Sequence, residues 1–251
     1  MATYVVADIH GYYDVFCRGL DLIGLGEDDR LYVIGDAIDR GPDGIRVLLD
    51  IMSHRNMDLL IGNHEFMMLN SVNADGEKHC DGLDSTLWLD YNGGRATWRR
   101  YKALREADRI SLVMWLSNRY VMKTIELNGI TYCLTHSYYK DGLENKPYYE
   151  LAYGDVWDIV WTSPYREDAE TYAPDIYPSY DMTFVTGHVP VRNIIIRHEG
   201  IIDYDDLEIH RKGNFIGIDG GCAYGKRTGM KNGALFLRLD DMEVFPVAMS
   251  D

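Results

Sequence analysis

The sequence is short of cysteine, proline and positive charge, and these shortages exclude several classes of protein. Its four cysteines include no Cys-x-x-Cys pair, which argues against a structural zinc site and a disulfide framework in 251 residues. Lysine and arginine total 25 against 40 aspartates and glutamates, a net charge of −15 that disfavours nucleic acid as a partner. Isolated thiols are typical of a reducing compartment, so we expect a cytoplasmic protein.

Long apolar runs and low-complexity linkers are also missing. No apolar stretch is long enough to cross a bilayer, so no membrane segment is expected. A strand-like run, Thr3–Ala7, follows the start without a basic segment, which predicts no signal peptide. Hydrophobic residues make up 46% of the chain, enough for a sizeable core. We therefore expect a single domain over residues 1–251.

The N-terminal part alternates between strand and helix patterns. Strand-like runs at Thr3–Ala7, Leu31–Ile34 and Asp58–Ile61 are separated by helical patterns. The helical patterns occupy Tyr12–Ile23 and Gly44–Arg55, where apolar residues recur at helical spacing. A β-α-β-α-β order predicts a parallel sheet with helical crossovers.

The rest of the chain predicts a helical insertion and a second sheet. Tryptophans among charged residues, mostly at helical spacing, indicate the insertion at about residues 71–118. Asn128-Gly129 between strand-like runs predicts a hairpin. A second, largely antiparallel sheet is predicted from the later short strand-like runs, which are Met182–Thr186, Asn193–Arg197, Ile201–Tyr204, Leu207–His210, Phe215–Asp219, Ala234–Leu239 and Val244–Val247. The expected fold is α/β, a central β-sandwich of two mixed sheets flanked by helices.

Three polar motifs follow the first three strand-like runs. They are Asp8-Ile9-His10-Gly11, Gly35-Asp36-Ala37-Ile38-Asp39-Arg40-Gly41 and Gly62-Asn63-His64-Glu65. Because the carboxyl ends of parallel strands share one edge of a sheet, we expect these side chains to converge. His136 and His188 follow later strand-like runs. Carboxylate, amide and imidazole ligands together favour Mn, Fe or Zn over Mg or Ca.

These residue types can carry out two-metal phosphoester hydrolysis. Two divalent ions can share a water and direct it in line at phosphorus. Arg40 can hold two phosphate oxygens, and a histidine beside a carboxylate can protonate an alkoxide leaving group. Structural alternatives exist, because a lone histidine is often only hydrogen-bonded and Asp36 or Asp39 could cap a helix. That alternative does not explain the Arg-Gly-Pro sequence after Asp39.

The ordered motifs D-x-H-G, G-D-x-x-D-R-G, G-N-H-E, H and G-H-x-P resemble the metallo-dependent phosphoprotein phosphatase family. The similarity is strongest to its bacterial and lambda-phage-like serine/threonine phosphatase branch. It extends from Asp8 to about Gly225, and Trp88–Thr97 is similar to part of that branch's helical insertion. The resemblance implies the metallophosphoesterase fold and two divalent metal ions, with manganese favoured and iron or zinc possible.

Carried over to this chain, the resemblance implies roles for individual residues. The first metal ion would be held by Asp8, His10 and Asp36. The second would be held by Asp36, Asn63, His136 and His188, with Asp36 bridging the two. His64 would be the general acid, oriented by Asp39. The substrate would contact Arg40, Asn63 and Arg166.

At Arg166 the sequence departs from the family's pattern. Many family members carry a phosphate-binding arginine shortly after a tryptophan. Here Trp161 is followed by Thr162-Ser163-Pro164-Tyr165, so Arg166 would have to act from a shifted position.

The predicted function is hydrolysis of phosphoserine or phosphothreonine monoesters by in-line attack of a metal-bridging water or hydroxide. The substrate would be a phosphorylated protein or a small phosphoester, with neither nucleic acid nor membrane as a partner; the sequence does not predict the oligomeric state. The alternative is a symmetrical diadenosine tetraphosphate hydrolase, that is, a dinucleoside polyphosphate hydrolase. Asp39 favours the phosphatase, because the second motif of the alternative group usually lacks an aspartate before the arginine. A metal-binding interaction module without catalysis is a third hypothesis.

Overall fold

The structure is a computed structural model that describes residues 1–73, 75–77, 82–163, 180–226 and 230–249. Arg166 lies outside the described residues, so its predicted role stays a prediction. Among the helices of the described residues, none combines the length and apolar character of a membrane span.

The first sheet has five strands in the order β10-β9-β1-β2-β3. The parallel strands are β1 (Thr3–Val6), β2 (Arg30–Ile34) and β3 (Met57–Leu60). Strand β9 (Gly233–Arg238) pairs antiparallel with β1, and β10 (Glu243–Ala248) pairs antiparallel with β9. The predicted β-α-β-α-β opening therefore forms three neighbouring parallel strands.

The second sheet also has five strands, in the order β4-β5-β6-β8-β7. The hairpin at Asn128-Gly129 joins its first two strands, and both turn residues have positive φ. The three central strands run parallel, and the two outer ones are antiparallel to them. The strands are β4 (Met122–Leu127), β5 (Ile130–Thr135), β6 (Thr183–Thr186), β7 (His210–Lys212) and β8 (Phe215–Gly217).

Apolar side chains from both sheets form a shared core. Val5 and Leu60 of the first sheet belong to one buried cluster with Leu134, Val185 and Ile216 of the second. The two sheets therefore pack face to face, which confirms the predicted α/β sandwich of two mixed sheets.

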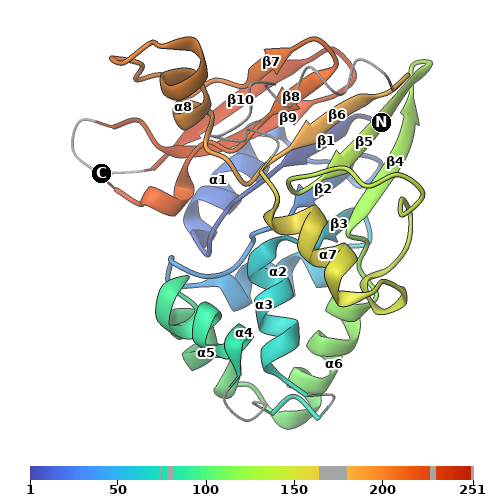
Figure 1. Cartoon of the computed structure of the whole chain (residues 1–251), viewed down its shortest axis with the longest axis vertical. Coiled ribbons are helices and arrows are strands. Elements are labelled where there is room, and N and C mark those ends of the chain that lie inside the picture. Colours follow the sequence, from blue (N-terminus) through green and yellow to red (C-terminus); the bar gives the residue numbers. More distant parts are fainter. Residues whose placement is uncertain (74, 78–81, 164–179, 227–229, 250–251) are drawn as a thin grey trace.

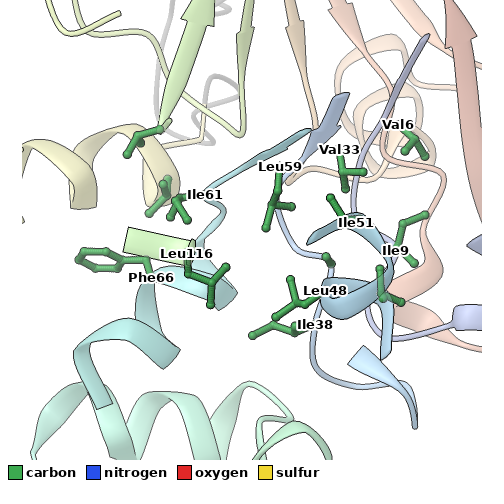
Figure 2. Packing of buried hydrophobic residues seen from close by; sticks show 14 of the residues in the cluster. Val6, Ile9, Val33, Ile38, Leu48, Ile51, Leu59, Ile61, Phe66 and Leu116 are labelled. Carbon is green, nitrogen blue, oxygen red and sulfur yellow. The ribbon is translucent and has the colours of Figure 1, made fainter. Parts of the chain in front are cut away.

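Helices cover the outer face of the first sheet, and most of them gather at one end of the molecule, with α8 at the other (Figure 1). Figure 2 shows Val33 and Leu59 of the sheet beside Leu48 and Ile51 of α2, and all four side chains are buried. Helix α1 ends at Gly24, which takes the left-handed conformation that favours glycine. The helices outside the insertion are α1 (Tyr13–Ile23), α2 (Gly44–Ser53), α3 (Asn63–Ser71), α7 (Tyr153–Trp161) and α8 (Val191–Ile194).

The described part of the predicted insertion is helical. It contains α4 (Leu83–Thr86), a π-helical turn (Leu87–Tyr91), α5 (Arg95–Lys102) and α6 (Glu106–Ser117). These helices lie below the sheets in the view of Figure 1, at the same end as α2 and α3. The insertion therefore approaches the sheet edge from which the polar motifs project.

Three predictions about the C-terminal part are wrong. The strand expected at Asn193–Arg197 is helical, because Val191, Ile194 and Ile195 recur at helical spacing and pack on the core. The described structure has no strand at Ile201–Tyr204, and β7 begins only at His210, the last residue of the expected strand Leu207–His210.

The strands expected at Ala234–Leu239 and Val244–Val247 are present but belong to the first sheet rather than the second. The second sheet is also mixed rather than largely antiparallel. Long connections, including the one that contains α7, return the chain in the same direction, which a short hairpin cannot do.

Candidate metal centre

The structure brings the predicted ligands to the carboxyl ends of five strands. Asp8 and His10 follow β1, the Asp36 loop follows β2, and Asn63 begins α3 just after β3. In the second sheet, His136 follows β5 and His188 follows β6. Because both sheets direct these ends toward one edge of the sandwich, residues far apart in sequence lie close together.

Backbone strain is concentrated at this edge. Of the nine described non-glycine residues with positive φ, six belong to the predicted site. A left-handed conformation is costly for such residues and persists where the surrounding structure enforces it, often at functional sites. The six residues are Asp8, His10, Asp36, Asp39, Arg40 and His188.

One side of the site is a group around Asp36 and His10. Nε2 of His10 lies 3.7 Å from Oδ2 of Asp36 and 4.0 Å from Oδ1 of Asp8. Nε2 of His64 also lies 3.7 Å from Oδ2 of Asp36. A cluster of potential ligands on this side therefore contains His10, Asp36 and His64, with Asp8 beside it.

The other side is a group around His136 and Asn63. Nε2 of His136 lies 3.5 Å from Oδ1 of Asp36 and 2.9 Å from Oδ1 of Asn63. Nδ1 of His188 lies 3.0 Å from the same Asn63 oxygen. Asp36 faces both groups with different carboxylate oxygens, as a bridging ligand would.

Hydrogen bonding sets which histidine nitrogens are available. Nδ1 of His10 lies 3.2 Å from the carbonyl oxygen of Ile38, and Nδ1 of His136 lies 3.0 Å from that of Ile34. A carbonyl only accepts, so each Nδ1 carries a proton, and Nε2 is the nitrogen of each ring that faces the carboxylate of Asp36. Imidazole nitrogens and carboxylate oxygens that converge in this way fit a bound cation.

The protonation states also fit metal ligands. Burial alone would raise the pKa of Asp36, but the imidazoles of His136, His64 and His10 outweigh it and hold that pKa below its usual value. Burial, reinforced by His136, lowers the pKa of His188 to about 3. Burial, with His64 nearby, also lowers the pKa of His10. Ionised carboxylates and neutral imidazoles are the forms that bind metal ions.

A further buried carboxylate, Asp219, adds negative charge at the site. Burial raises its pKa to about 7, and Asp36 adds to that rise. Burial and then Asp219 raise the pKa of Asp8 well above its usual value. Asp219 was not among the site residues predicted from the sequence. A cation would stabilise the charged form of all three carboxylates.

Glu65 holds the loop that carries Asp36. Its carboxylate is buried and accepts the backbone N–H groups of Asp36 at 2.8 Å, Ala37 at 2.9 Å, Ile38 at 3.3 Å and Gly62 at 3.1 Å. The last of these bonds closes the first turn of α3, as expected for a residue that sets the helix start. Glu65 therefore acts on the site through the backbone.

His64 and Asp39 form a close pair. Nδ1 of His64 donates to Oδ2 of Asp39 at 2.6 Å, and both side chains are buried. Burial would lower the pKa of His64, but Asp36 and Asp39 outweigh it and raise that pKa. A histidine held in this way can carry a proton at Nε2 toward the site.

A cleft of about 170 Å³ opens onto these groups. The exposed Arg40 lines it, as do Asn63, His64 and Trp161. With liquid water occupying about 30 Å³ per molecule, the cleft has room for a phosphoryl group with a few waters. Asn92, from the predicted insertion, also lines the cleft and was not among the site residues predicted from the sequence.

The comparisons with known proteins agree with this geometry. The family model described as calcineurin-like phosphoesterase matches residues 1–212. A relative from Nitrosomonas europaea, named bis(5'-nucleosyl)-tetraphosphatase, symmetrical, is 31% identical over 107 residues, covering 41% of this chain and 40% of the relative. The chain thus matches less than half the length of that relative.

Two solved structures share the fold. A chain described as a candidate diadenosine tetraphosphatase aligns with a TM-score of 0.61 at 16% identity, covering 99% of this chain and 94% of that chain. A protein serine/threonine phosphatase from Saccharomyces cerevisiae aligns with a TM-score of 0.52 at 15% identity, covering 100% of this chain and 80% of that chain. The resemblance predicted from the motifs is thereby confirmed, and the chain belongs to the calcineurin-like phosphoesterase family.

Proposed function

We propose that the chain uses two divalent metal ions to hydrolyse dinucleoside polyphosphates symmetrically. The observation that carries the metal-dependent chemistry is the cluster of carboxylate and imidazole groups around Asp36, open to a cleft that Arg40 lines. The substrate class is supported by the relative named as a symmetrical bis(5'-nucleosyl)-tetraphosphatase. It corresponds to the alternative of the sequence analysis, which the comparisons favour over a phosphoprotein substrate.

The proposed ligand sets follow the two groups of the site. Asp8, His10 and Asp36 would hold one ion. The other would be held by Asp36, Asn63, His136 and His188. Divalent ions bound there would supply Lewis acidity and an activated water, and manganese, iron and zinc suit this donor set.

The remaining residues would act on the phosphoryl group directly. Arg40 reaches the cleft with a planar guanidinium that can bind two phosphoryl oxygens. His64 would donate its Nε2 proton to the leaving oxygen as the P–O bond breaks. Asp39 would keep the imidazole oriented through the bond at Nδ1.

One observation favours a second candidate, hydrolysis of phosphoserine or phosphothreonine monoesters. A nucleoside polyphosphate departs as a stable anion, whereas the alkoxide of serine or threonine needs a proton. The buried 2.6 Å contact between His64 and Asp39 is the arrangement of a well-held acid, which benefits the poorer leaving group most.

The two candidates separate in one experiment. The protein is freed of metal by chelation, manganese is added back, and diadenosine tetraphosphate and a phosphothreonine peptide are supplied in parallel. We expect metal-dependent formation of ADP alone from the dinucleotide. Faster phosphate release from the peptide would establish the second candidate. If neither substrate is hydrolysed when manganese, iron or zinc is added back, both candidates are contradicted.

A further inference from the structure

The helical insertion contacts the acid pair through a tryptophan. Trp88 lies in the π-helical turn Leu87–Tyr91 and is fully buried. Its indole Nε1 donates to Oδ2 of Asp39 at 2.8 Å. The same carboxylate oxygen accepts Nδ1 of His64 at 2.6 Å. Trp88, Asp39 and His64 therefore form a chain of hydrogen bonds that leads from the insertion to the site.

The two bonds to one oxygen determine how the carboxylate is turned. Among the residues that the structure describes, Oδ1 of Asp39 has no hydrogen-bond partner. The backbone N–H of Asp39 donates to Oγ1 of Thr97, also in the insertion, at 3.0 Å. The insertion thus holds the backbone of Asp39 through Thr97 and its side chain through Trp88. Without the indole N–H, only His64 would orient the carboxylate.

The local structure around Trp88 is adapted to this position. A Cβ atom on Gly94 would lie 2.5 Å from both Cδ1 and Nε1 of Trp88, so a glycine is needed beside the indole. Trp88 also has an aromatic neighbour, since Trp98 packs edge-on against it with ring centroids 6.1 Å apart. The carbonyl of Gly93 also accepts the backbone N–H of Arg40 at 3.4 Å. The insertion therefore contacts both Asp39, through Trp88, and Arg40, through Gly93.

We propose that Trp88 is a positioning residue for the general acid, a role that rests on the proposed phosphoester hydrolysis. Its N–H holds Asp39 so that Nδ1–H of His64 keeps donating to the carboxylate and the ring directs Nε2 into the cleft. When the P–O bond breaks, the electron pair goes to the leaving oxygen, which takes the Nε2 proton. The imidazole is left neutral, with Nδ1–H still bound to Asp39.

The test uses leaving groups that differ in their need for a proton. 4-Nitrophenolate leaves as a stabilised anion, whereas phenolate is more basic and gains more from an acid. We expect W88F to lower kcat on phenyl phosphate about tenfold, part of the 10²–10⁴ that general acid catalysis supplies. On 4-nitrophenyl phosphate we expect less than a twofold change, which also shows that the variant is folded. KM should be unchanged on both substrates.

Matched variants separate positioning from packing. W98F removes a neighbouring tryptophan of the same insertion and should affect both substrates equally and weakly. D39N should give the same selective loss as W88F, and the double variant should lose less than the product of the two single effects. If W88F does not fold, W88Y keeps a large ring without the indole N–H and should show the same pattern.

The outcomes distinguish failure of the proposed Trp88 role from failure of the proposed function. If the wild type turns over both esters but W88F and W88Y lose equal factors on both, or lose nothing, the role of Trp88 is refuted and the proposed function stands. If the metal-loaded wild type hydrolyses neither these esters nor the dinucleotide and peptide, both proposals are overturned.

Discussion

Replacing Glu65 with glutamine tests whether this residue holds the Asp36 loop. The buried carboxylate accepts N–H groups from Asp36, Ala37, Ile38 and Gly62, two at each oxygen. Glutamine keeps one acceptor oxygen and replaces the other with an NH₂ group, which cannot accept. Two hydrogen bonds to a charged group are therefore lost, each contributing roughly 1.5–3 kcal/mol. We expect the free energy of unfolding to fall by about 3–6 kcal/mol.

The assay is urea unfolding of the chelated protein at pH 8. That pH ionises the carboxylate in the folded state, because burial and then Asp36 raise the pKa of Glu65 to about 7. Chelation removes stabilisation by bound metal from the comparison. The control, Glu106→Gln, changes an exposed residue in the first turn of α6 and should stay within about 0.5 kcal/mol of the wild type. A loss below about 1 kcal/mol for Glu65→Gln would refute the argument, since even one such bond contributes more than that.

Two further changes test the site and the pH dependence of folding. Asp36→Asn removes the carboxylate that faces both ligand groups. Turnover should fall by more than about a hundredfold, which exceeds the usual loss when only a residue that hydrogen-bonds a metal ligand is replaced. Activity within tenfold of the wild type would contradict the bridging role. Asp29 accepts the N–H groups of Ala2 at 2.6 Å and Gly26 at 3.0 Å, which hold its pKa below 3.8. This stabilisation is present above pH 3.8 and is lost as the pH falls through the folded-state pKa, so Asp29→Asn should cost about 1 kcal/mol at pH 7 and less at pH 3 in denaturant titrations. An equal cost at both pH values would show that the carboxylate charge is not responsible.

The sequence predicted the placement of the site where local pattern and topology agree. Asp8, Asp36 and Asn63 each follow a short apolar strand, and parallel strands deliver such residues to one edge. The hairpin at Asn128-Gly129 was equally predictable, because both turn residues must take positive φ. The roles assigned to these side chains stay predictions, since the geometry shows proximity and not chemistry.

The features that were predicted wrongly or not at all depend on contacts between segments that are distant in the sequence. Asn193–Arg197 is rich in isoleucine and resembles a strand, but packing of one face on the core makes it helical. The pairing of β9 with β1 joins segments far apart in the chain, and no short-range pattern specifies it. The bond between Trp88 and Asp39 likewise depends on the path of the insertion. The similarity of Trp88–Thr97 to a family segment indicated that this region matters. It did not indicate that Trp88 contacts Asp39.

The most direct test of the account is the number of metal ions that the chain binds. Chelated wild type and Asp36→Asn are titrated with manganese, and bound metal is measured by elemental analysis alongside hydrolysis. We expect two ions per wild-type chain, hydrolysis that rises as they bind, and loss of both metal binding and hydrolysis in Asp36→Asn. Full hydrolysis by metal-free protein, or a wild type that binds no divalent ion, would contradict it.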